Sequence, residues 1–233
     1  MNIALLGYGK MGKVIETIAL ERGHKIVFKS SSNTLEIDLS EADIAIDFSI
    51  PNAAVNNIST CFKNNTPVVS GTTGWLDNYP NMVELCQKTN GAFIYASNFS
   101  VGVNVFFELN AHLAKMMRQL KQYNVSIEEI HHTQKLDAPS GTAISLAEGI
   151  IDNTNNSSWK LDSTSENNQI PIIAKRIKDV PGTHHIKYSS TVDSIEITHT
   201  AHNRHGFALG AVMAAEWLLN KKGVYTMKDV LGL

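Results

Sequence analysis

A glycine-rich segment near the start of the chain limits the possible folds more than any other feature of the sequence. Gly7-Tyr8-Gly9-Lys10-Met11-Gly12 follows a short apolar run, Ile3–Leu6, and precedes an amphipathic stretch near residues 11–22. In the pattern G-x-G-x-x-G, the first glycine permits a tight turn, the second lets the backbone approach a pyrophosphate, and the third allows close packing of helix on strand. Because this segment stands between a predicted strand and a predicted helix, it indicates a dinucleotide-binding unit. A glycine-rich turn without a ligand is the alternative.

The first hundred residues repeat this alternation of short apolar runs with longer amphipathic ones. Such a rhythm predicts an α/β domain, a doubly wound parallel sheet of Rossmann-like topology, over residues 1–98. The predicted strands are Ile3–Leu6, Lys25–Phe28, Ile44–Phe48, Val68–Ser70 and Ala92–Ala96, and the predicted helices lie near 11–22, 52–63 and 82–89.

The pattern changes after Asn98. Apolar residues from Val103 to Leu120 fall near helical spacing and predict a long helix, and 124–131 alternates like a strand. Further strands are expected at 170–177, 185–189 and 194–199, so residues 99–205 should form a second α+β domain with a mixed or antiparallel sheet. The segment 152–169 is rich in Asn, Ser and Thr and predicts a solvated loop. The apolar stretch 207–219 needs burial, and we expect residues 206–233 to return to the first domain.

The composition excludes several classes of protein. The 233 residues are 43% hydrophobic and carry a net charge of −2, so no strong field attracts nucleic acid or anionic lipid. No apolar run approaches the roughly 18 residues of a membrane span, and no leader peptide is visible. Cys61 and Cys86 are too few for a disulfide framework and lack metal-binding spacing. We expect a cytoplasmic protein without nucleic-acid or membrane partners.

A cluster of proton-exchanging side chains follows the predicted strand 124–131. His131 and His132 stand at its end, and Lys135 follows three residues later. Histidine side chains exchange protons near neutral pH, whereas a lysine ammonium stays charged and donates. Because neighbouring residues of a strand point to opposite sides, only one of the two histidines should face the reacting groups.

A predicted helix start lies just beyond this cluster. Ser140 or Pro139 can open a helix whose first backbone N–H groups, at Gly141 and Thr142, would face a bound carboxylate or phosphate. The whole run from Glu128 to Thr142 therefore indicates proton-transfer chemistry on an anion.

The residues after the second predicted strand bear on the choice of cofactor. A Rossmann site for NADH usually carries an acidic residue at this point, where it binds the ribose 2′-hydroxyl. Here the strand is followed by Lys29-Ser30-Ser31-Ser32, one cation and three hydroxyls with no acid. This composition predicts that NADPH is used at least as well as NADH, although an ordinary surface turn would have the same composition.

These motifs together resemble the dihydrodipicolinate reductase family. The run matches that family's E-x-H-H-x-x-K-x-D-A-P-S-G-T, and 199–211 matches its H-x-A-x-x-R-x-x-F-A-x-G-A. One departure is Lys178, which replaces a glycine in the element R-x-G-x-x-x-G-x-H that ends at His184. The resemblance implies NAD(P)H-dependent reduction of a cyclic dicarboxylate, 4-hydroxy-tetrahydrodipicolinate, with loss of water, in lysine and diaminopimelate biosynthesis. It also implies a homotetramer assembled through the second sheet.

The resemblance assigns roles to the residues of the run. His131 takes the acid/base role, Lys135 the proton-donor role, and His132 binds substrate, while Ser140, Gly141 and Thr142 bind a substrate carboxylate. Motifs and resemblance together give a cofactor site of NADPH or NADH that consists of Gly7, Tyr8, Gly9, Lys10, Met11, Gly12, Lys29, Ser30, Gly71, Thr72, Thr73, Ala96, Ser97, Asn98 and Phe99. No metal site is expected, because the histidine pairs lack the usual ligand spacing.

Two other interpretations remain open from the sequence. An amino-acid or aldehyde dehydrogenase could share the two-domain plan and keep Gly7–Gly12, but it has no evident need for the run from His131 to Thr142. A nucleotide-sensing or assembly protein could retain a vestigial site, although the joint presence of His131, Lys135 and Thr142 argues against it.

Overall fold

The computed structural model describes residues 1–31, 34, 36–162 and 168–233 of the chain. These residues form two compact units, unit 1 with Met1–Val101 and Arg204–Leu233, and unit 2 with Gly102–Asn203. In the described ranges, no helix combines the length and the apolar character that a membrane crossing requires.

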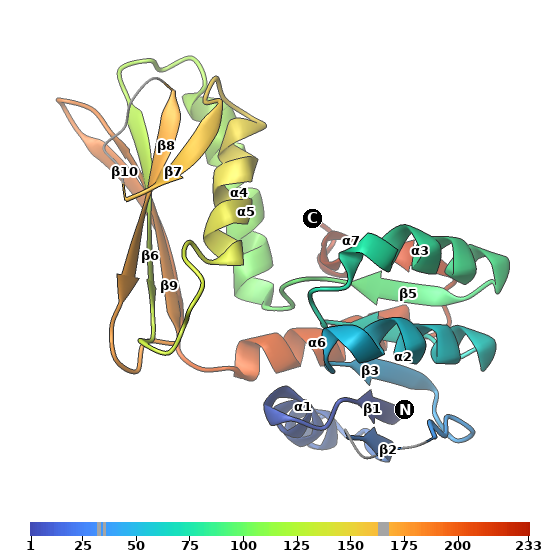
Figure 1. The fold of residues 1–233 in the computed structure, drawn as a ribbon. Helices are drawn as coiled ribbons and strands as arrows, with labels where there is room; N and C mark the ends of the chain where they lie inside the picture. The colour runs from blue at the N-terminus through green and yellow to red at the C-terminus, as the bar shows by residue number, and fades with distance from the viewer. Residues whose placement is uncertain (32–33, 35, 163–167) are drawn as a thin grey trace. The chain divides into compact units, whose positions relative to one another are not determined.

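Unit 1 is built on a six-stranded parallel sheet (Figure 1). Its strands are β1 (Asn2–Leu6), β2 (Lys25–Ser30), β3 (Ile44–Asp47), β4 (Val68–Ser70), β5 (Ala92–Tyr95) and β11 (Gly223–Tyr225). Their order is β11-β5-β4-β3-β1-β2, so the chain first builds outward from β1 to β2 and then continues on the other side of β1 with β3. The Rossmann-like α/β fold predicted from the sequence is confirmed.

Helices cover both faces of this sheet because alternate strand residues point to opposite sides. Ile3 and Leu5 of β1 share a core with α1 (Lys10–Glu21) and α6 (His205–Leu218). Ala4 and Leu6 share another core with α2 (Pro51–Lys63) and α3 (Tyr79–Lys88). A 3₁₀ turn at Leu76–Asn78 and the short α7 (Met227–Leu231) complete the unit. The apolar stretch near the C-terminus thus supplies α6 to the core of the first sheet.

The turns that leave the strands of unit 1 line one edge of the sheet. The Phe48 N–H donates to Leu6 O at 2.8 Å, the Gly71 N–H to Asp47 O at 2.9 Å, and the Ala96 N–H to Ser70 O at 3.2 Å. The segments after β1, β3, β4 and β5 are therefore held side by side at the carboxyl ends of parallel strands, where open α/β sheets bind their ligands.

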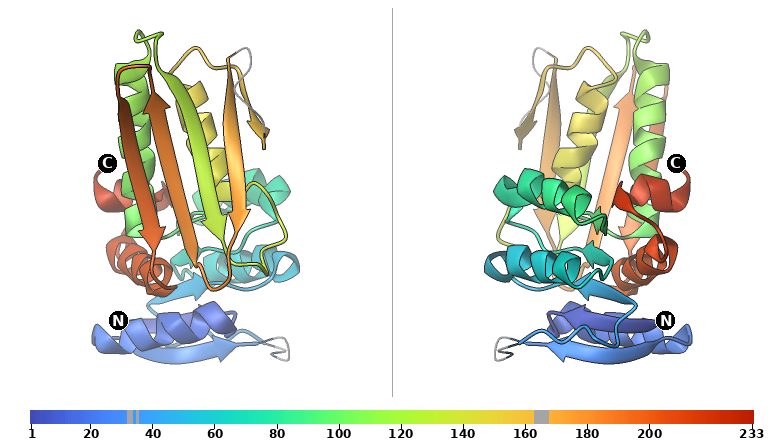
Figure 2. Two further views of the ribbon diagram at one scale, coloured as in Figure 1. Left: turned by 90° about the vertical axis from the view of Figure 1, so that its left-hand side faces the viewer. Right: turned by 90° about the vertical axis from the view of Figure 1, so that its right-hand side faces the viewer.

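Unit 2 contains a five-stranded mixed sheet of order β10-β9-β6-β8-β7. Its strands are β6 (Asn124–His131), β7 (Ser158–Leu161), β8 (Gln169–Arg176), β9 (Gly182–Ser189) and β10 (Ser194–Ala201). Central β6 pairs antiparallel with β9 and parallel with β8. Two helices, α4 (Val101–Met117) and α5 (Gly141–Ile151), cover one face of this sheet and leave the other open (Figure 2).

The structure corrects one secondary-structure prediction. The segment 152–169 was expected to be a solvated loop, but Ser158–Leu161 forms β7, in which Trp159 pairs with Ile170 and Leu161 with Ile172. This edge strand has one neighbour and is only partly buried, so its sequence lacks the apolar run of a central strand. Residues 163–167 of the same segment lie outside the described residues.

Candidate active site

The glycine-rich turn after β1 has the shape that a dinucleotide requires. Gly7 has φ +101°, and a Cβ at this position would lie 2.2 Å from Phe48 O, so only glycine fits. A Cβ at Gly12 would lie 2.4 Å from Gly7 O, whereas Gly9 faces open space. No side chain caps α1, whose first residues are Lys10 and Met11. The positive end of α1 is therefore accessible to a pyrophosphate.

The end of β2 differs from the sequence expectation. Ser30 is buried and accepts a hydrogen bond from the Gly7 N–H at 3.1 Å, so it holds the glycine-rich turn. Lys29 forms an ion pair with Glu16 of α1 and lies over the Tyr8 ring, 4.6 Å from its centroid. The hydrogen bond to Glu16 raises the pKa of Lys29. The strand end itself carries a cation and no acid, as the sequence predicted, but α1 supplies an acid, Glu16, beside Lys29. Ser32 lies outside the described residues.

A buried carboxylate organises the turns after β3 and β4. Asp47 is 0% exposed, and four side chains donate to it: Ser49 Oγ at 2.7 Å, Asn57 Nδ2 at 2.9 Å, and Ser70 Oγ and Thr72 Oγ1 at 2.8 Å each. Burial raises the pKa of Asp47, and these hydrogen bonds oppose that rise. The Ser49 N–H also donates to Thr72 Oγ1 at 2.8 Å. Asp47 thus locks Thr72 and the neighbouring Gly71 in place.

The remaining cofactor residues predicted from the sequence differ in exposure. Thr73 and Ser97 are exposed at the same sheet edge. The ring of Phe48 lies so close to Gly71 that a Cβ there would be 2.3 Å from Phe48 Cζ. Phe99 is 1% exposed and its ring packs 5.7 Å from that of Phe48, so its side chain belongs to the core.

In unit 2, β6 brings the acid/base residues to one end of the sheet. Burial alternates along this strand, and Glu129 and His131 share the buried, helix-covered face with Val125 and Ile127. His132 follows the last residue of the strand and is half-buried. The two histidines therefore have different environments, and His131 is the one held inside the unit.

Glu129 is the centre of a buried polar cluster. It is 0% exposed and forms ion pairs with His131 Nδ1 and with Arg176 Nη2, the latter at 3.0 Å, and it accepts the Ser140 N–H at 3.3 Å. Burial alone would raise the pKa of Glu129, but the hydrogen bonds and positive charges of His131 and Arg176 outweigh it and lower the pKa to about 2. Glu129 is therefore an anion that fixes the imidazole of His131.

A second histidine joins this cluster from β9. His184 pairs with Glu129 in the β6–β9 ladder, and its ring centroid lies 5.1 Å from that of His131. Its Nε2 is 3.2 Å from Ser140 Oγ. Burial, followed by the charge of His131, lowers the pKa of His184 to about 4, which keeps this ring neutral. A Cβ at Gly182 would lie 3.1 Å from His131 Nε2, so the glycine leaves room for that ring.

Ser140 connects the cluster to the start of α5. It is the N-cap residue, and its Oγ accepts the Ala143 N–H at 3.2 Å, so the helix begins at Gly141 as one of the two sequence alternatives predicted. Gly141 is exposed and has no atom within 4 Å of an added Cβ. The positive end of α5 is thus exposed at Gly141, where an anion can approach it.

Lys135 lies in the loop between β6 and α5. Its Nζ contacts both carboxylate oxygens of Asp137, at 2.7 and 2.9 Å. The hydrogen bond to Lys135 lowers the pKa of Asp137. Arg176 Nη2 donates to Asp137 O at 2.7 Å, which ties this loop to the Glu129 cluster. The loop therefore presents a cation near the start of α5.

Glu129, His131 and His184 also have the chemistry of metal ligands, and their ligand atoms lie within 4.8 Å of one another. The spacing rules did not reveal this cluster because its members come from two strands. Arg176 and the Ser140 N–H already contact Glu129 Oε1, and the Ser140 hydroxyl contacts His184. A positively charged guanidinium beside the carboxylate disfavours a cation, so we assign no metal to the site.

Comparison with family models decides the affiliation of the chain. The N-terminal model of dihydrodipicolinate reductase matches residues 1–99, and the C-terminal model matches residues 102–231. The chain belongs to the dihydrodipicolinate reductase family. A 4-hydroxy-tetrahydrodipicolinate reductase of Christiangramia forsetii is 62% identical over 99% of this chain and 98% of that protein. The enzyme of the same name from Thermosipho africanus is 36% identical over the same shares of both chains.

Solved structures share the fold of this family member. Dipicolinate-bound dihydrodipicolinate reductase from Paenisporosarcina sp. TG-14 superposes with a TM-score of 0.80 at 22% identity and covers 98% of each chain. Aspartate semialdehyde dehydrogenase II from Vibrio cholerae gives a TM-score of 0.53 at 12% identity over 92% of this chain and 97% of that one. The two-domain fold is thus shared with dehydrogenases, and the matches to the family models distinguish this chain from them.

Five residues of the site received no individual role from the sequence. Glu129, Arg176 and His184 were parts of recognised motifs but had no assigned task, and Asp47 and Glu16 were not considered. The alternation of β6 could have indicated Glu129, since it places this acid beside His131 on a buried face. Asp47 lies at the end of an otherwise apolar strand, which is a usual position for a residue near a ligand. Nothing in the sequence connects Glu16 with Lys29.

Proposed function

We propose that the protein reduces 4-hydroxy-tetrahydrodipicolinate to tetrahydrodipicolinate, with loss of water, in lysine and diaminopimelate biosynthesis. One observation supports this proposal most strongly: the buried acid–base cluster of Glu129, His131 and Arg176 is joined through Ser140 to an open helix N-terminus. Such a site suits a dianionic ring that must exchange a proton. We place the enzyme in the cytoplasm, a reducing compartment in which buried free thiols such as Cys61 and Cys86 are common.

In this proposal unit 1 holds a nicotinamide cofactor. Gly7, Gly9 and Gly12 provide the turn for its pyrophosphate at the start of α1, and the Gly71–Thr73 and Ala96–Asn98 turns flank the nicotinamide half. The bound cofactor supplies the hydride. Asp47 would hold Thr72 and Gly71 in the conformation that binds the cofactor.

Unit 2 would bind and protonate the substrate. The amides at Gly141 and Thr142 and the hydroxyl of Ser140 would hold one carboxylate, and His132 would contact the ring. Lys135 would stabilise negative charge and donate a proton. His131 would exchange a proton with the substrate as an acid/base group, and Glu129 would hold its imidazole in one orientation.

We further propose that NADPH is used at least as well as NADH. No acidic side chain is attached to the end of β2 itself, where Lys29 contributes an ammonium group. Glu16 neutralises Lys29 in the present arrangement. A 2′-phosphate would have to compete with Glu16 for Lys29, so we expect a modest preference.

The open face of the unit 2 sheet supports a homotetramer. Ile173 is 40% exposed there, and the face also carries the ion pairs Lys175–Glu128 and Lys187–Glu196. Strand β10 forms an edge with mostly exposed residues, and edges of this kind are commonly covered by another copy. Light scattering at micromolar concentration should give the mass of four chains, and a monomer would contradict this part of the proposal.

The decisive experiment is to follow cofactor oxidation with different substrates. The purified chain should oxidise NADPH or NADH when freshly generated 4-hydroxy-tetrahydrodipicolinate is added, but not with simple aldehydes or with 2-oxo acids and ammonia. The variant His131→Gln should bind cofactor and turn over slowly, which controls for contaminating reductases. Oxidation with an aldehyde at a similar rate would favour the dehydrogenase interpretation, and cofactor binding without any turnover would favour the sensing protein.

A further inference from the structure

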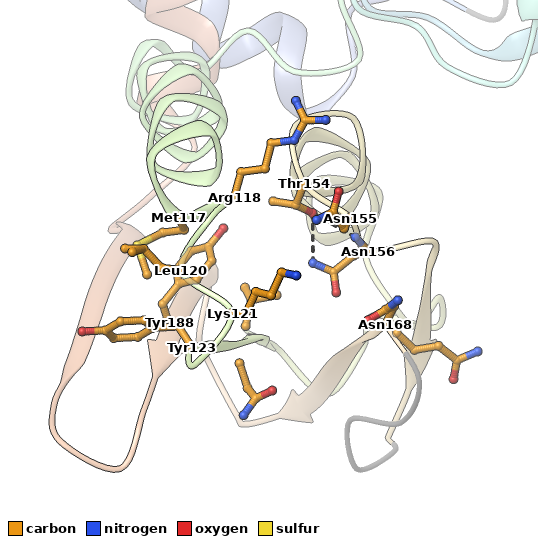
Figure 3. Close-up of a pocket in the computed structure, with 13 residues that line it drawn as sticks. Met117, Arg118, Leu120, Lys121, Tyr123, Thr154, Asn155, Asn156, Asn168 and Tyr188 are labelled. Atoms are coloured by element: carbon orange, nitrogen blue, oxygen red, sulfur yellow. Dashed lines mark hydrogen bonds between the residues drawn. The ribbon is translucent and has the colours of Figure 1, made fainter.

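A polar cavity of about 430 Å³ lies in unit 2, far from His131 (Figure 3). It is lined by residues from the end of α4, the start of β6, the segment after α5, the start of β8 and the end of β9, among them Arg118, Lys121 and Tyr188. Strand β6 runs from Asn124 at this cavity to His131 in the acid–base cluster. The two places are therefore roughly 20 Å apart along one strand.

The charged side chains that line the cavity are all positive. Arg118 and Lys121 contribute two cations, and the thirteen described residues that line the cavity include no Asp or Glu. In the part of the chain that the structure describes, neither cation forms an ion pair with a carboxylate. Figure 3 shows the Lys121 side chain reaching from the turn after α4 toward Asn156. Two cations without a neutralising acid favour an anionic ligand.

A buried hydroxyl gives a second, independent indication. Tyr188 lines the cavity, is 3% exposed, and its Oη has no hydrogen-bond partner among the described residues. Tyr188 alternates with His184 and Ile186 on the helix-covered face of β9, so it belongs to the same side of the sheet as the cavity. A buried hydroxyl without a partner is costly, and a ligand oxygen would satisfy it.

The rest of the lining offers neutral hydrogen-bonding groups. The side-chain amides of Asn155, Asn168 and Gln169 contribute both donors and acceptors. Asn156 is partly engaged, because its Nδ2 donates to Thr154 Oγ1 at 2.9 Å. Amides of this kind suit hydroxyl groups, and the volume exceeds that of a lone phosphate and falls in the range of small-molecule sites.

We propose that this cavity is a second ligand site, distinct from the substrate site, for a small hydroxylated molecule that carries a phosphate or carboxylate group. Arg118 and Lys121 hold the oxyanion, because a guanidinium fork and an ammonium both match phosphate and carboxylate oxygens. The amides hold the hydroxylated body, and Tyr188 Oη donates to a ligand oxygen.

Calorimetric titration of the full chain tests this site with four probes. Ribose 5-phosphate and ribonate combine a hydroxylated body with a phosphate and a carboxylate, respectively, whereas inorganic phosphate and ribose each carry one half of that chemistry. At least one of the two combined probes should bind at least about tenfold more tightly than phosphate or ribose. The better of the two identifies the oxyanion.

Variants locate the binding. The double variant Arg118→Ala/Lys121→Ala should weaken binding of the better probe at least about tenfold. Lys115→Ala is the matched control, because Lys115 is an exposed lysine on α4 that does not line the cavity. Tyr188→Phe should weaken binding while the melting temperature without ligand stays unchanged or rises, since the lost hydroxyl had no partner.

Three results would overturn the proposal. The first is the absence of saturable binding by both combined probes. The second is binding that survives unchanged in the double variant, which would place the probe in the cofactor or substrate site. The third is a clear drop in the melting temperature of Tyr188→Phe without ligand, which would show that the hydroxyl is already satisfied within the protein.

Discussion

Units 1 and 2 each contain a carboxylate that is 0% exposed, and the two have opposite surroundings. Asp47 of unit 1 accepts hydrogen bonds from three hydroxyls and one amide, none of which changes its charge near neutral pH. Glu129 of unit 2 contacts an imidazole and a guanidinium. Burial raises the pKa of Asp47, whereas its charged partners hold the pKa of Glu129 down to about 2.

This difference separates the two tasks of the enzyme. The carboxylate of Asp47, which accepts from four neutral donors, fixes the shape of the turns after β3 and β4. A carboxylate paired with a histidine sets the orientation of a group that exchanges protons. In our proposal unit 1 therefore positions the cofactor, and unit 2 carries out the acid–base chemistry. Each prediction below challenges this separation.

The largest expected effect is on turnover from unit 2. His131→Gln and Lys135→Ala should each lower kcat roughly 10²- to 10⁴-fold, because they remove a positioned proton-transfer group. The Kd of the cofactor, measured by quenching of its fluorescence, should stay the same because neither residue belongs to unit 1. His112→Gln, at an exposed position of α4, is the control for loss of any histidine. Near-normal kcat in either variant would remove that residue from the mechanism.

A second effect is on the stability of unit 1. Asp47→Ala removes the acceptor of four hydrogen bonds and should lower the free energy of unfolding by roughly 2–4 kcal/mol. Asp43→Ala, which removes an exposed carboxylate at the other end of β3, should cost less. The measurement is chemical denaturation of both variants. Equal losses would mean that the buried network around Asp47 does not stabilise the turns.

A third effect is on stability at acid pH. The pKa of His184 is lowered by burial from 6.5 to about 4, so between these values the unfolded chain binds a proton that the folded chain does not. This group therefore leaves stability unchanged above pH 6.5 and lowers it as the pH falls toward 4, by on the order of 2–3 kcal/mol. Glu129 lowers the stability of the folded chain further only below about pH 4.5. His184→Gln should flatten the melting temperature between pH 6.5 and 4.5. An unchanged slope would show that His184 is not the titrating group.

The smallest effect concerns a partly exposed ion pair of unit 1. Lys29→Glu removes the cation next to Glu16 and should shift the ratio of kcat/KM values toward NADH by up to about fivefold, since exposed charges contribute about 1 kcal/mol or less. Glu16→Gln should shift it the other way, because Lys29 would then be available to a 2′-phosphate. Measurements at low ionic strength maximise both shifts. A ratio that is the same in both variants would mean that this turn does not contact the 2′ position.

Much of the fold and part of the site follow from local sequence. The glycine-rich turn, the end of β6 at His131 and the cap at Ser140 each depend on residues a few positions apart, and short-range rules describe them well. The parallel sheet followed from the strand–helix rhythm for the same reason. Strand β7 could not be predicted, because it gains its structure from pairing with β8 and not from its own composition.

The rest of the site depends on contacts between distant parts of the chain. Glu129 meets His184 through the register of β6 on β9, and it meets Arg176 through β8, and neither register is visible in the sequence. The Lys29–Glu16 pair brings together a strand end and a helix face. A search for an acid on β2 alone therefore missed the one supplied by α1.

The separation of tasks is tested most directly by measuring cofactor Kd and kcat in Glu129→Gln and Asp47→Asn, two changes that remove one buried charge each and keep the side-chain size. Glu129→Gln weakens a charge-assisted hydrogen bond to His131, worth about 1.5–3 kcal/mol, so kcat should fall about 10- to 150-fold while cofactor Kd stays within about twofold. Asp47→Asn should raise the cofactor Kd several-fold, on the order of 1 kcal/mol, with a smaller change in kcat. If Glu129→Gln mainly raised the cofactor Kd, or Asp47→Asn mainly lowered kcat, the assignment of positioning to unit 1 and proton transfer to unit 2 would be contradicted.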